Sequence, residues 1–343
     1  MKLVKTILCL VIILVLSASL FAGKAKTGTT AYPFLKIGVG AKSLSMGGAF
    51  VGLADDESAV YYNPAGIIGF QQKAISGSYM NYIADIQSGN LIAILPKSTP
   101  AVAEAEGLGE EPVFHDAQSA FAFSIVYLNY GKIDKTNFAG DILGDFGGSD
   151  MAIGATYARK LSPQLACGGT AKFIYQKIDQ YSSTGLAVDA GLLYRLGDGR
   201  TNVGLSASNL GVQLSGLSPE HKDPLPITLR GGISHRTREL PLTVALEAVY
   251  PTDNDIYGSV GLEIHPNIPI ALRAGYSTFG QNYKTGGSKD KTAGFSFGAG
   301  FKLAKMAVDY AFLPYADLGS LHRVGFAYRF NVASKAAAPT DRW

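Results

Sequence analysis

Along most of the chain, apolar residues alternate with small or polar ones, which is the pattern of β-strands whose two faces differ. In "GLAVDAGLLYRL" (185–196), one face carries Leu186, Val188, Ala190, Leu192, Tyr194 and Leu196, and the other carries Gly185, Ala187, Asp189, Gly191 and Arg195. The same division recurs at 242–250, 295–301 and 322–330. One face is therefore apolar and often ends in an aromatic residue, while the other is small, polar or charged.

This two-faced pattern fits a water-soluble β-sandwich or a barrel in a membrane, and composition separates the two. The second face of a soluble sandwich meets water and carries many Lys, Glu and Thr residues, whereas here it is rich in Gly, Ala and Ser. The chain has 41 Gly and only 17% charged residues, against about 25% in a typical soluble domain. Small polar side chains inside and apolar ones outside indicate an outer-membrane barrel, which must close so that no strand edge stays unpaired in hydrocarbon.

Turn signals between the alternating segments divide the chain into roughly fourteen strands, an even number as such barrels usually have. The signals lie at 197–200, 239–241, 265–269 and 287–291. Longer polar stretches at 97–116, 133–150, 215–226 and 280–291 are predicted to form loops on the outward rim, with tight turns on the periplasmic side. The predicted fold is an all-β, antiparallel outer-membrane β-barrel over residues 71–330, followed by a short C-terminal tail at 331–343.

The first residues have the order of a secretory signal peptide. Lys2 and Lys5 precede an uninterrupted apolar run that ends in small residues, and the run is too short for a comfortable transmembrane helix. We predict a signal peptide at 1–22 and export to the outer membrane. Cys9 lies in this segment and leaves Cys167 alone in the mature chain, which argues against an intrachain disulfide or a multi-cysteine metal site.

Residues 27–70 do not alternate and come just before the first strand, so they can fold back into the lumen as a plug. Within them, "NPAG" (63–66) is a rigid corner. Pro64 fixes its own φ and biases Asn63 away from helix, while Ala65 and Gly66 let the backbone turn without bulk.

The stretch "FLKIGVGAKSLSMGGAFVGLADDESAVYYNPAGI" (34–67) resembles the N-terminal hatch of the FadL-type hydrophobic-compound transporters, and more closely that of the PorV/PorQ branch. The shared features are the Gly-Ala-Lys-Ser run, the Gly-Gly-Ala after it, the Asp-Asp pair and the Asn-Pro-Ala-Gly corner. Residues 308–330 give weaker support. The resemblance implies an outer-membrane barrel of about fourteen strands with an N-terminal luminal hatch.

Charged residues of the hatch and of the barrel wall form the candidate gating site. The hatch residues are Asp55, Asp56, Glu57, Asn63, Pro64, Ala65 and Gly66. The luminal charges predicted on the small-polar strand faces are Arg195, Arg230, Glu247, Glu263, Arg273 and Arg323, together with Arg329. We expect the acidic run 55–57 to pair with luminal arginines and hold the hatch in place. The alternative is a solvated turn, because exposed ion pairs contribute little.

The residues give no support for catalysis, a metal or a cofactor. "GVGAKS" (38–43) is similar to a phosphate-binding loop, but Ala41 stands where the loop needs glycine and no strand–loop–helix setting is evident. The histidines at 115, 221, 235, 265 and 322 are isolated, and nothing in the sequence assembles a serine, a histidine and an acid into a catalytic set. The net charge of +3 is too small and scattered for nucleic-acid binding. We therefore predict a non-enzyme with no metal, no cofactor and no nucleic-acid partner.

Two functions remain, and both follow from the resemblance. One is binding of a hydrophobic, fatty-acid-like compound and its passage across the outer membrane, as in FadL-type proteins. The other is a non-transporting role like that of PorV/PorQ proteins, as an accessory of type IX secretion or a docking site for cell-surface proteins. A bulged strand beside the hatch with an apolar pocket would favour transport, and long ordered outer loops with a binding groove would favour docking. The expected partners are outer-membrane lipid and either a hydrophobic small molecule or a secreted protein.

Overall fold

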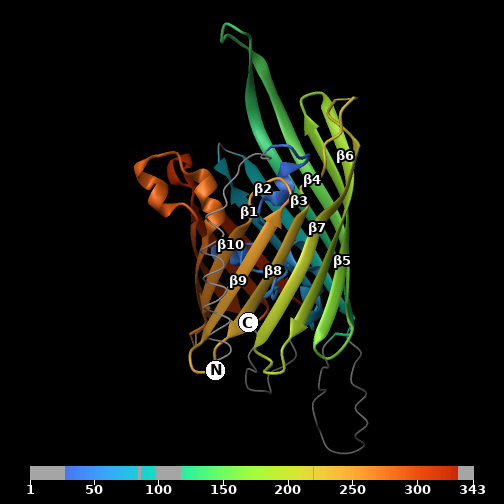
Figure 1. Cartoon of the computed structure of the whole chain (residues 1–343), viewed down its shortest axis with the longest axis vertical. Coiled ribbons are helices and arrows are strands. Elements are labelled where there is room, and N and C mark those ends of the chain that lie inside the picture. Colours follow the sequence, from blue (N-terminus) through green and yellow to red (C-terminus); the bar gives the residue numbers. More distant parts are fainter. Residues whose placement is uncertain (1–27, 84–85, 98–116, 219, 267, 331–343) are drawn as a thin grey trace, which may run out of the picture.

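Fourteen antiparallel strands form a closed barrel around a folded N-terminal segment (Figure 1). The computed structural model describes residues 28–83, 86–97, 117–218, 220–266 and 268–330. The strands are β1 Ala74–Asn81, β2 Gln87–Lys97, β3 Ser119–Thr136, β4 Ile142–Lys160, β5 Leu165–Ile178, β6 Tyr181–Arg195, β7 Thr201–Ser215, β8 Thr228–Arg236, β9 Leu242–Pro251, β10 Tyr257–Ile264, β11 Ile270–Ser277, β12 Phe295–Leu303, β13 Met306–Pro314 and β14 Ser320–Arg329. The predicted signal peptide at 1–22 and the predicted tail at 331–343 lie outside the described residues.

The first and last strands pair with each other, so the sheet has no free edge around its circumference. β1 pairs with β14 along its whole length, from Ala74 opposite Arg329 to Asn81 opposite His322. Every other strand pairs with its two neighbours in the sequence. Closure of this kind satisfies the backbone hydrogen bonds that hydrocarbon would otherwise leave unpaired. The predicted all-β antiparallel barrel of about fourteen strands is confirmed.

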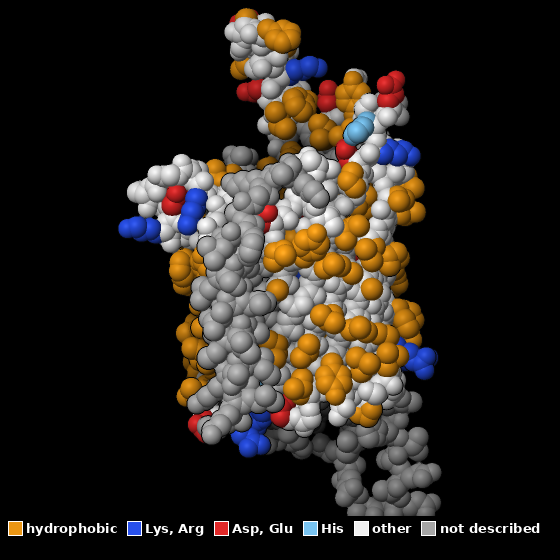
Figure 2. Space-filling model, viewed as in Figure 1, with side chains coloured by type: hydrophobic (Ala, Val, Ile, Leu, Met, Phe, Trp, Pro, Cys, Tyr) orange, Lys and Arg blue, Asp and Glu red, His pale blue; other side chains and the backbone are white. Residues whose placement is uncertain are grey.

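The two faces of the strands differ as the alternation predicts. In β6, Leu186, Val188 and Leu192 are exposed on the outside, while Ala187 and Asp189 are buried on the inside. Figure 2 shows apolar side chains spread over the outer wall, with charged side chains toward the two rims. A closed barrel with this outer face is a membrane-spanning barrel of the outer-membrane type. The predicted localisation in the outer membrane is therefore confirmed.

Successive connections lie at opposite ends of the barrel because the strands alternate in direction. Short turns follow β4, β6, β8, β10 and β12, and the chain enters β1 and leaves β14 at this same end, which is the periplasmic end of such barrels. The loops after β7 and β11 lie at the outer rim, as predicted. The expectation that 97–116 forms an outer loop is wrong, because Lys97 of β2 pairs with Ser119 of β3 at the periplasmic end. Residues 98–116 themselves lie outside the described residues.

Residues 133–150, also expected to form a loop, are mostly strand. β3 and β4 continue to a turn at 137–141 and form a hairpin, here called the β3–β4 arm (residues 132–147), which rises beyond the neighbouring strands at the outer rim (Figure 1, green). The prediction failed because a two-stranded ribbon in water has no face to bury. Its strands can be stabilised by polar side-chain pairs across the ribbon, so its sequence is as polar as that of a loop. Lys132 and Asp145 form one such pair at 3.0 Å.

Residues 28–73, here called the N-terminal segment, lie inside the barrel and contain four short helices (Figure 1, blue). These are η1 Pro33–Lys36, α2 Ala41–Ser45, α3 Ala59–Tyr62 and η2 Pro64–Gly69. The segment starts near the outer rim, where the Ala31 amide donates to the Pro224 carbonyl at 2.9 Å. It ends at the start of β1, at the periplasmic end. Within the described part of the chain, no helix is long and apolar enough to cross a membrane.

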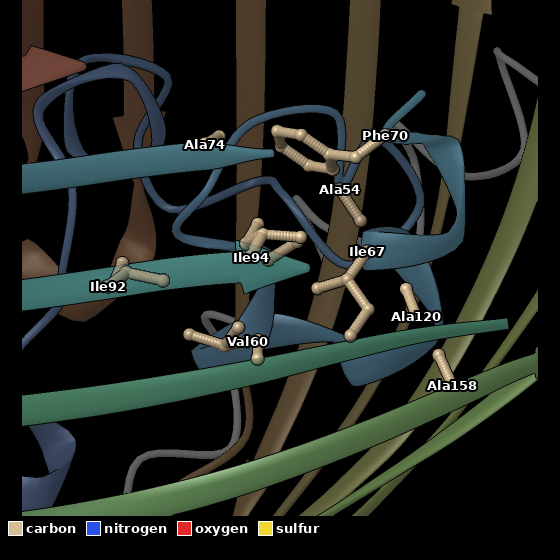
Figure 3. Packing of buried hydrophobic residues seen from close by; sticks show 11 residues of the cluster. Ala54, Val60, Ile67, Phe70, Ala74, Ile92, Ile94, Ala120 and Ala158 are labelled. Carbon is tan, nitrogen blue, oxygen red and sulfur yellow. The ribbon is translucent and has the colours of Figure 1, made fainter. Parts of the chain in front are cut away.

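A small apolar core fixes the periplasmic part of the segment to the wall (Figure 3). Its buried members are Ala54, Ala59, Val60, Ile67 and Phe70 of the segment and Ala74, Ile92, Ile94, Ala120, Ala122 and Ala158 of β1 to β4. The wall of β3 and β4 contributes only alanines here, which leaves room for the Ile67 side chain. Burial of these side chains is the main local driving force, because apolar area removed from water stabilises by about 25 cal/mol per Å².

Elsewhere the backbone of the segment lies directly against glycines on the inner face of the wall. A Cβ atom built on Gly204 would lie 2.0 Å from the Val51 carbonyl oxygen, and one built on Gly275 would lie 2.1 Å from the Gly47 nitrogen. Other atoms of the segment approach similarly at Gly168, Gly185, Gly191, Gly232, Gly261 and Gly298. Many of the glycines of the inner face are therefore explained by close contact with the segment.

Gly204→Val is expected to displace the segment and leave the barrel intact. Valine suits a strand, but its side chain would occupy the position of the Val51 carbonyl. The variant should keep heat-modifiable migration in detergent gels, and should show faster hydrogen exchange and new protease cuts between residues 45 and 60. Gly169→Val is the matched control, because a Cβ there meets no atom closer than 3.4 Å. Native protection of the segment in Gly204→Val would contradict the close approach.

Candidate functional site

A cavity of about 360 Å³ lies in the lumen between the N-terminal segment and the outer rim. Its floor comes from the segment, through Ile37, Leu44, Tyr61 and Tyr62. Inward side chains of strands around the barrel form its wall, and loops at the outer rim complete it. The lining is mainly aliphatic and aromatic with a few polar groups, which is the composition of a pocket for small apolar molecules.

Aromatic side chains from three outer loops close one side of this cavity. Tyr82 follows β1, Tyr283 ends η4 Thr278–Tyr283, and Tyr315 precedes η6 Ala316–Leu318. The rings of Tyr283 and Tyr315 meet edge to face with centroids 4.2 Å apart, and those of Tyr82 and Tyr315 are 6.1 Å apart. They pack with buried Met80 and Leu321. The cavity therefore presents ring faces and edges to anything inside it.

One strand of the cavity wall is irregular. The register of β6 and β7 shifts between Val188 and Ala190, and Asn209 of β7 has a φ of 62°. The Asn209 amide donates to Asp189 Oδ1 at 2.8 Å, and its side-chain oxygen accepts from Lys172 Nζ at 2.7 Å. Lys172 and Asp189 also form a buried ion pair at 2.7 Å. This bulged strand beside an apolar cavity is the feature that the sequence reasoning associated with transport.

Hydrogen bonds of Asn63 fix the "NPAG" corner both to the rest of the segment and to the barrel wall. The Asn63 side-chain amide donates to the Val51 and Leu192 carbonyls, each at 2.9 Å, and its oxygen accepts from the Ala65 amide at 3.2 Å. Pro64 then begins η2, where its missing amide hydrogen is not needed. At Gly66 a Cβ would lie 2.4 Å from the Ala54 carbonyl oxygen, so no larger residue fits. Ala65 is fully buried.

Glu247 of β9 connects the wall to the middle of the segment. Its Oε2 accepts from the Phe50 and Val51 amides, each at 2.7 Å, and its Oε1 accepts from Arg230 Nη1 at 2.8 Å. Arg230 also lies over the Tyr62 ring, 5.3 Å from its centroid. The carboxylate thus satisfies two amides of an irregular backbone and a buried guanidinium at once, so its removal would leave all three donors without their acceptor.

The acidic run meets the wall in a different way from the expected one. Asp55 pairs with Lys42 of α2 at 2.9 Å, and Lys42 pairs with Glu263 of β10 at 2.9 Å. Burial alone would lower the pKa of Lys42, but Asp55 and Glu263 outweigh it and raise the pKa above its usual value. Glu263 in turn accepts from Arg273 Nε at 2.5 Å. Asp309 of β13 is the second partner of that arginine, at 2.5 Å from Nη1.

Of the three acids, Glu57 pairs with a barrel arginine: its Oε1 accepts from Arg329 Nε at 3.1 Å. Asp56 instead accepts from the Ser58 amide at 2.8 Å and from the Ser58 hydroxyl at 2.5 Å, which orients the start of α3. Burial inside the lumen, followed by the adjacent Glu57, raises the pKa of Asp56 to about 7. The expectation that Asp55 and Asp56 pair with luminal arginines is therefore wrong, because nearer partners within the segment take both side chains.

The remaining two arginines of the prediction lie apart from this network. Arg195 ends β6 at the periplasmic end, beside Ile68 and Gly69 of the segment. Arg323 of β14 is 1% exposed and forms no ion pair with any residue in the described ranges. Among the predicted luminal charges, Arg230 thus groups with Glu247 and Arg273 with Glu263, while Arg329 pairs with Glu57 of the segment.

The predicted site lacks several charged residues of the lumen, among them Asp309, the second partner of Arg273. Lys42 lies in the stretch that is similar to a phosphate-binding loop, and nothing in its sequence context indicates that it links Asp55 to the wall. The alternation already places Asp189 on the small-polar face, and Lys172 lies at an inward position of the adjacent strand, so the same pattern could have placed it as well. Over the described residues, no group of three or more His, Cys, Asp or Glu side chains is placed to hold a metal ion.

Comparison with known proteins finds the fold among transport barrels. No known family and no curated protein matches the chain. The toluene transporter TodX of Pseudomonas putida is 13% identical with a TM-score of 0.58, over 86% of this chain and 98% of that chain. The toluene transporter TbuX of Ralstonia pickettii is 12% identical with a TM-score of 0.51, over 86% and 99%. A Pseudomonas aeruginosa FadL homologue is 10% identical with a TM-score of 0.51, over 85% and 98%.

At these identities the likeness shows a shared fold, that of the FadL-type outer-membrane barrels. It does not test the PorV/PorQ assignment, which stays a prediction.

Glu247→Gln is expected to loosen the middle of the segment more than the barrel. The amide keeps the shape but loses the charge that faces Arg230 and two backbone amides. Breaking a buried pair costs about 3 kcal/mol, so hydrogen exchange at residues 46–54 should become about 100-fold faster. Glu239→Gln, in an exposed turn, should change nothing. Equal exchange rates in the two variants would show that Glu247 does not hold the segment.

Proposed function

We propose that the protein binds hydrophobic small molecules in its luminal cavity and passes them across the outer membrane, with the N-terminal segment as the hatch that closes the lumen. The observation that carries this proposal is the cavity of about 360 Å³ with its aromatic and aliphatic lining. That volume lies within the range of about 300–1,000 Å³ usual for small-molecule pockets. TodX and TbuX, which share the fold, are toluene transporters.

The segment is suited to act as a hatch because it contacts strands all around the barrel below the cavity. α2 contacts β11 to β14, η2 contacts β2 to β6, and residues 46–52 lie against β7 to β11. A ligand in the cavity can therefore reach the periplasmic end only if the segment moves, or else it must leave through the wall. A lateral exit has one candidate place above Ser208, where β7 pairs with β6 and has no partner in β8.

A disulfide between the segment and the wall distinguishes these two routes. A Cβ on Gly325 of β14 would lie 3.7 Å from the Cβ of Ala41 in α2, and also 3.7 Å from that of Ser78 in β1. Both distances match the spacing of about 3.5–4.5 Å found in disulfides. Gly325 can therefore be linked either to the hatch or to the neighbouring strand, and the second link is a matched control.

With Cys167→Ala as background, oxidised Ala41→Cys/Gly325→Cys is expected to lose uptake of a labelled apolar solute such as toluene into vesicles, because the hatch cannot move. Reduction should restore uptake. The control Ser78→Cys/Gly325→Cys should transport in both states. Equal uptake by the two oxidised variants would mean that solute leaves through the wall, and absence of uptake by the wild type would contradict transport itself.

A second candidate function is docking of a secreted protein, in line with the PorV/PorQ resemblance, and the β3–β4 arm favours it. At its tip, Phe138 is 114% exposed, and Ile142 and Leu143 are 67% and 65% exposed. Apolar side chains held above the outer rim are candidates for a protein contact.

Replacing residues 133–146 with an Asn-Gly turn tests the docking function. Under the transport proposal, this variant should take up solute as the wild type does, because the arm does not line the cavity. Loss of an exported protein from the surface of cells carrying the variant would instead support docking. Unchanged uptake and unchanged surface proteins would leave the arm without a part in either function.

A further inference from the structure

Three cations lie side by side on the outer face of the barrel at its periplasmic end, and none has a counter-ion in the described ranges. Lys73 precedes β1, Lys97 ends β2 and Arg159 lies one residue before the end of β4. All three side chains are exposed. Neither the ion pairs of the wall nor those of the segment include them. These three residues are here called the basic patch.

The strand register makes the basic patch a single surface. Ser119 of β3 pairs with Lys97 on one side and with Arg159 on the other, so the backbones of these two cations are about 10 Å apart, two strand spacings. The register of β1 with β2 makes Lys73 a diagonal neighbour of Lys97, at about 7–8 Å. The Lys73 carbonyl also accepts from the Phe330 amide at 2.8 Å, which continues the pairing of β1 with β14. The patch is therefore held in place by paired strands and by closure of the barrel.

The basic patch lies at the level of the lipid head groups. On each strand, the residue two positions nearer the middle of the barrel is an exposed apolar side chain on the same face; these are Ile75, Leu95 and Tyr157. The Tyr157 ring packs against Phe121 of β3, with centroids 4.9 Å apart. Exposed aromatic side chains near the end of the apolar wall form the girdle that marks the membrane–water interface. The three cations lie just beyond this girdle.

The described parts of β1 to β4 hold no acid near the basic patch. β1 and β2 contain no Asp or Glu, and the acids of β3 and β4 are Asp134, Asp145 and Asp150, all in the outer halves of these strands. Lys and Arg side chains at an interface bury their apolar stems along the wall and keep their charges at the head groups. Between Lys97 and Arg159 stands the short Ser119 side chain, which leaves space between the two long ones and offers a hydroxyl as a further donor. The patch therefore has the form of an anion site that opens to the lipid layer.

We propose that the basic patch binds the phosphate of an anionic phospholipid in the periplasmic leaflet, with the acyl chains of that lipid against Leu95, Phe121 and Tyr157. Arg159 can donate two parallel hydrogen bonds to one phosphate, while the lysines add positive charge. A zwitterionic lipid brings its own cation beside the phosphate and would place it against the patch. An anionic lipid brings net negative charge, so the patch distinguishes the two. The inference does not depend on the proposed function, because it concerns the outer face of the wall and not the lumen.

Phosphatidylglycerol and phosphatidylethanolamine with the same oleoyl chains form a matched pair for the test, because they share the phosphate and the acyl chains and differ in net charge. The dissociation constant of the first bound lipid is measured by native mass spectrometry of the full-length barrel in detergent. A Lys or Arg near an anionic lipid strengthens binding about fivefold, so wild type should prefer phosphatidylglycerol by up to about 100-fold. Lys73→Gln/Lys97→Gln/Arg159→Gln should bind the two lipids equally. Each single Gln variant should lose about fivefold, which keeps the inference testable should the triple variant fail to fold.

Lys284→Gln/Lys289→Gln/Lys291→Gln is the matched control. It removes the same charge from three exposed lysines of the outer rim, in or near η5 Ser288–Thr292, that form no ion pair with a described residue. It should keep the wild-type preference for phosphatidylglycerol. Heat-modifiable migration verifies that each variant has a folded barrel. If the control loses the preference as fully as the patch variant does, net charge alone attracts the lipid and the inference is wrong.

Three further outcomes would overturn the inference. Equal binding of both lipids by wild type would show that the patch does not distinguish them. Competition by glycerol phosphate as strong as that by phosphatidylglycerol would make the patch a site for free phosphate, with no part for the acyl chains. Residues 98–116, which lie outside the described residues, carry Glu104, Glu106, Glu110, Glu111 and Asp116. If the preference appears only after these acids are replaced by Gln or Asn, a segment of the chain itself takes the charge of the patch.

Discussion

Hydrocarbon offers a protein backbone no hydrogen-bond partners, and the organisation of this protein follows from that constraint. The sheet has to close, as it does where β1 pairs with β14. With fourteen strands and an inner face of mostly small residues, the interior is wider than its own side chains can fill. The N-terminal segment runs through this space from near the outer rim to the periplasmic end, and its backbone approaches Gly204 and Gly275 more closely than any side chain would allow. The composition of the inner wall and the path of the segment therefore depend on each other.

Charge inside the lumen is arranged in pairs that join the segment to the wall. Lys42 of the segment reaches Glu263, and Glu57 of the segment reaches Arg329. Desolvation offsets most of the attraction within a buried pair, yet separating its members is expensive. Such pairs consequently contribute little to the stability of the barrel and much to the position of the segment. Arg323 is an exception among these charges, because it has no carboxylate partner within the described residues and donates instead to Ser78 and Asn90 of the wall.

The faces of the strands could be predicted from the sequence because a period of two is a local property, and a shift of one residue would turn a whole strand inside out. The rigid corner at Asn63 and Pro64 could be predicted for the same reason, because it depends only on residues adjacent in the sequence. Partners across the lumen were not predictable in this way. Asp55 and Lys42 are 13 positions apart in the chain and meet only after α2 and the acidic run fold back on each other. The β3–β4 arm was missed because polar alternation describes a strand in water as well as a loop.

As the proposed hatch, the segment would have to close the lumen and still be able to move, and its contacts divide between these two demands. Its periplasmic part is fixed by the apolar core around Ile67 and by the wall glycines. Its outer part, residues 33–39, lines the cavity directly, and Leu35 and Ile37 there are only half-buried. Gly40, with a φ of 86°, joins this part to α2. Under the proposed function, a ligand therefore competes first with the residues of the segment that line the cavity. Opening would then begin at the cavity, so that it depends on occupancy by the ligand rather than on spontaneous release of the periplasmic seal.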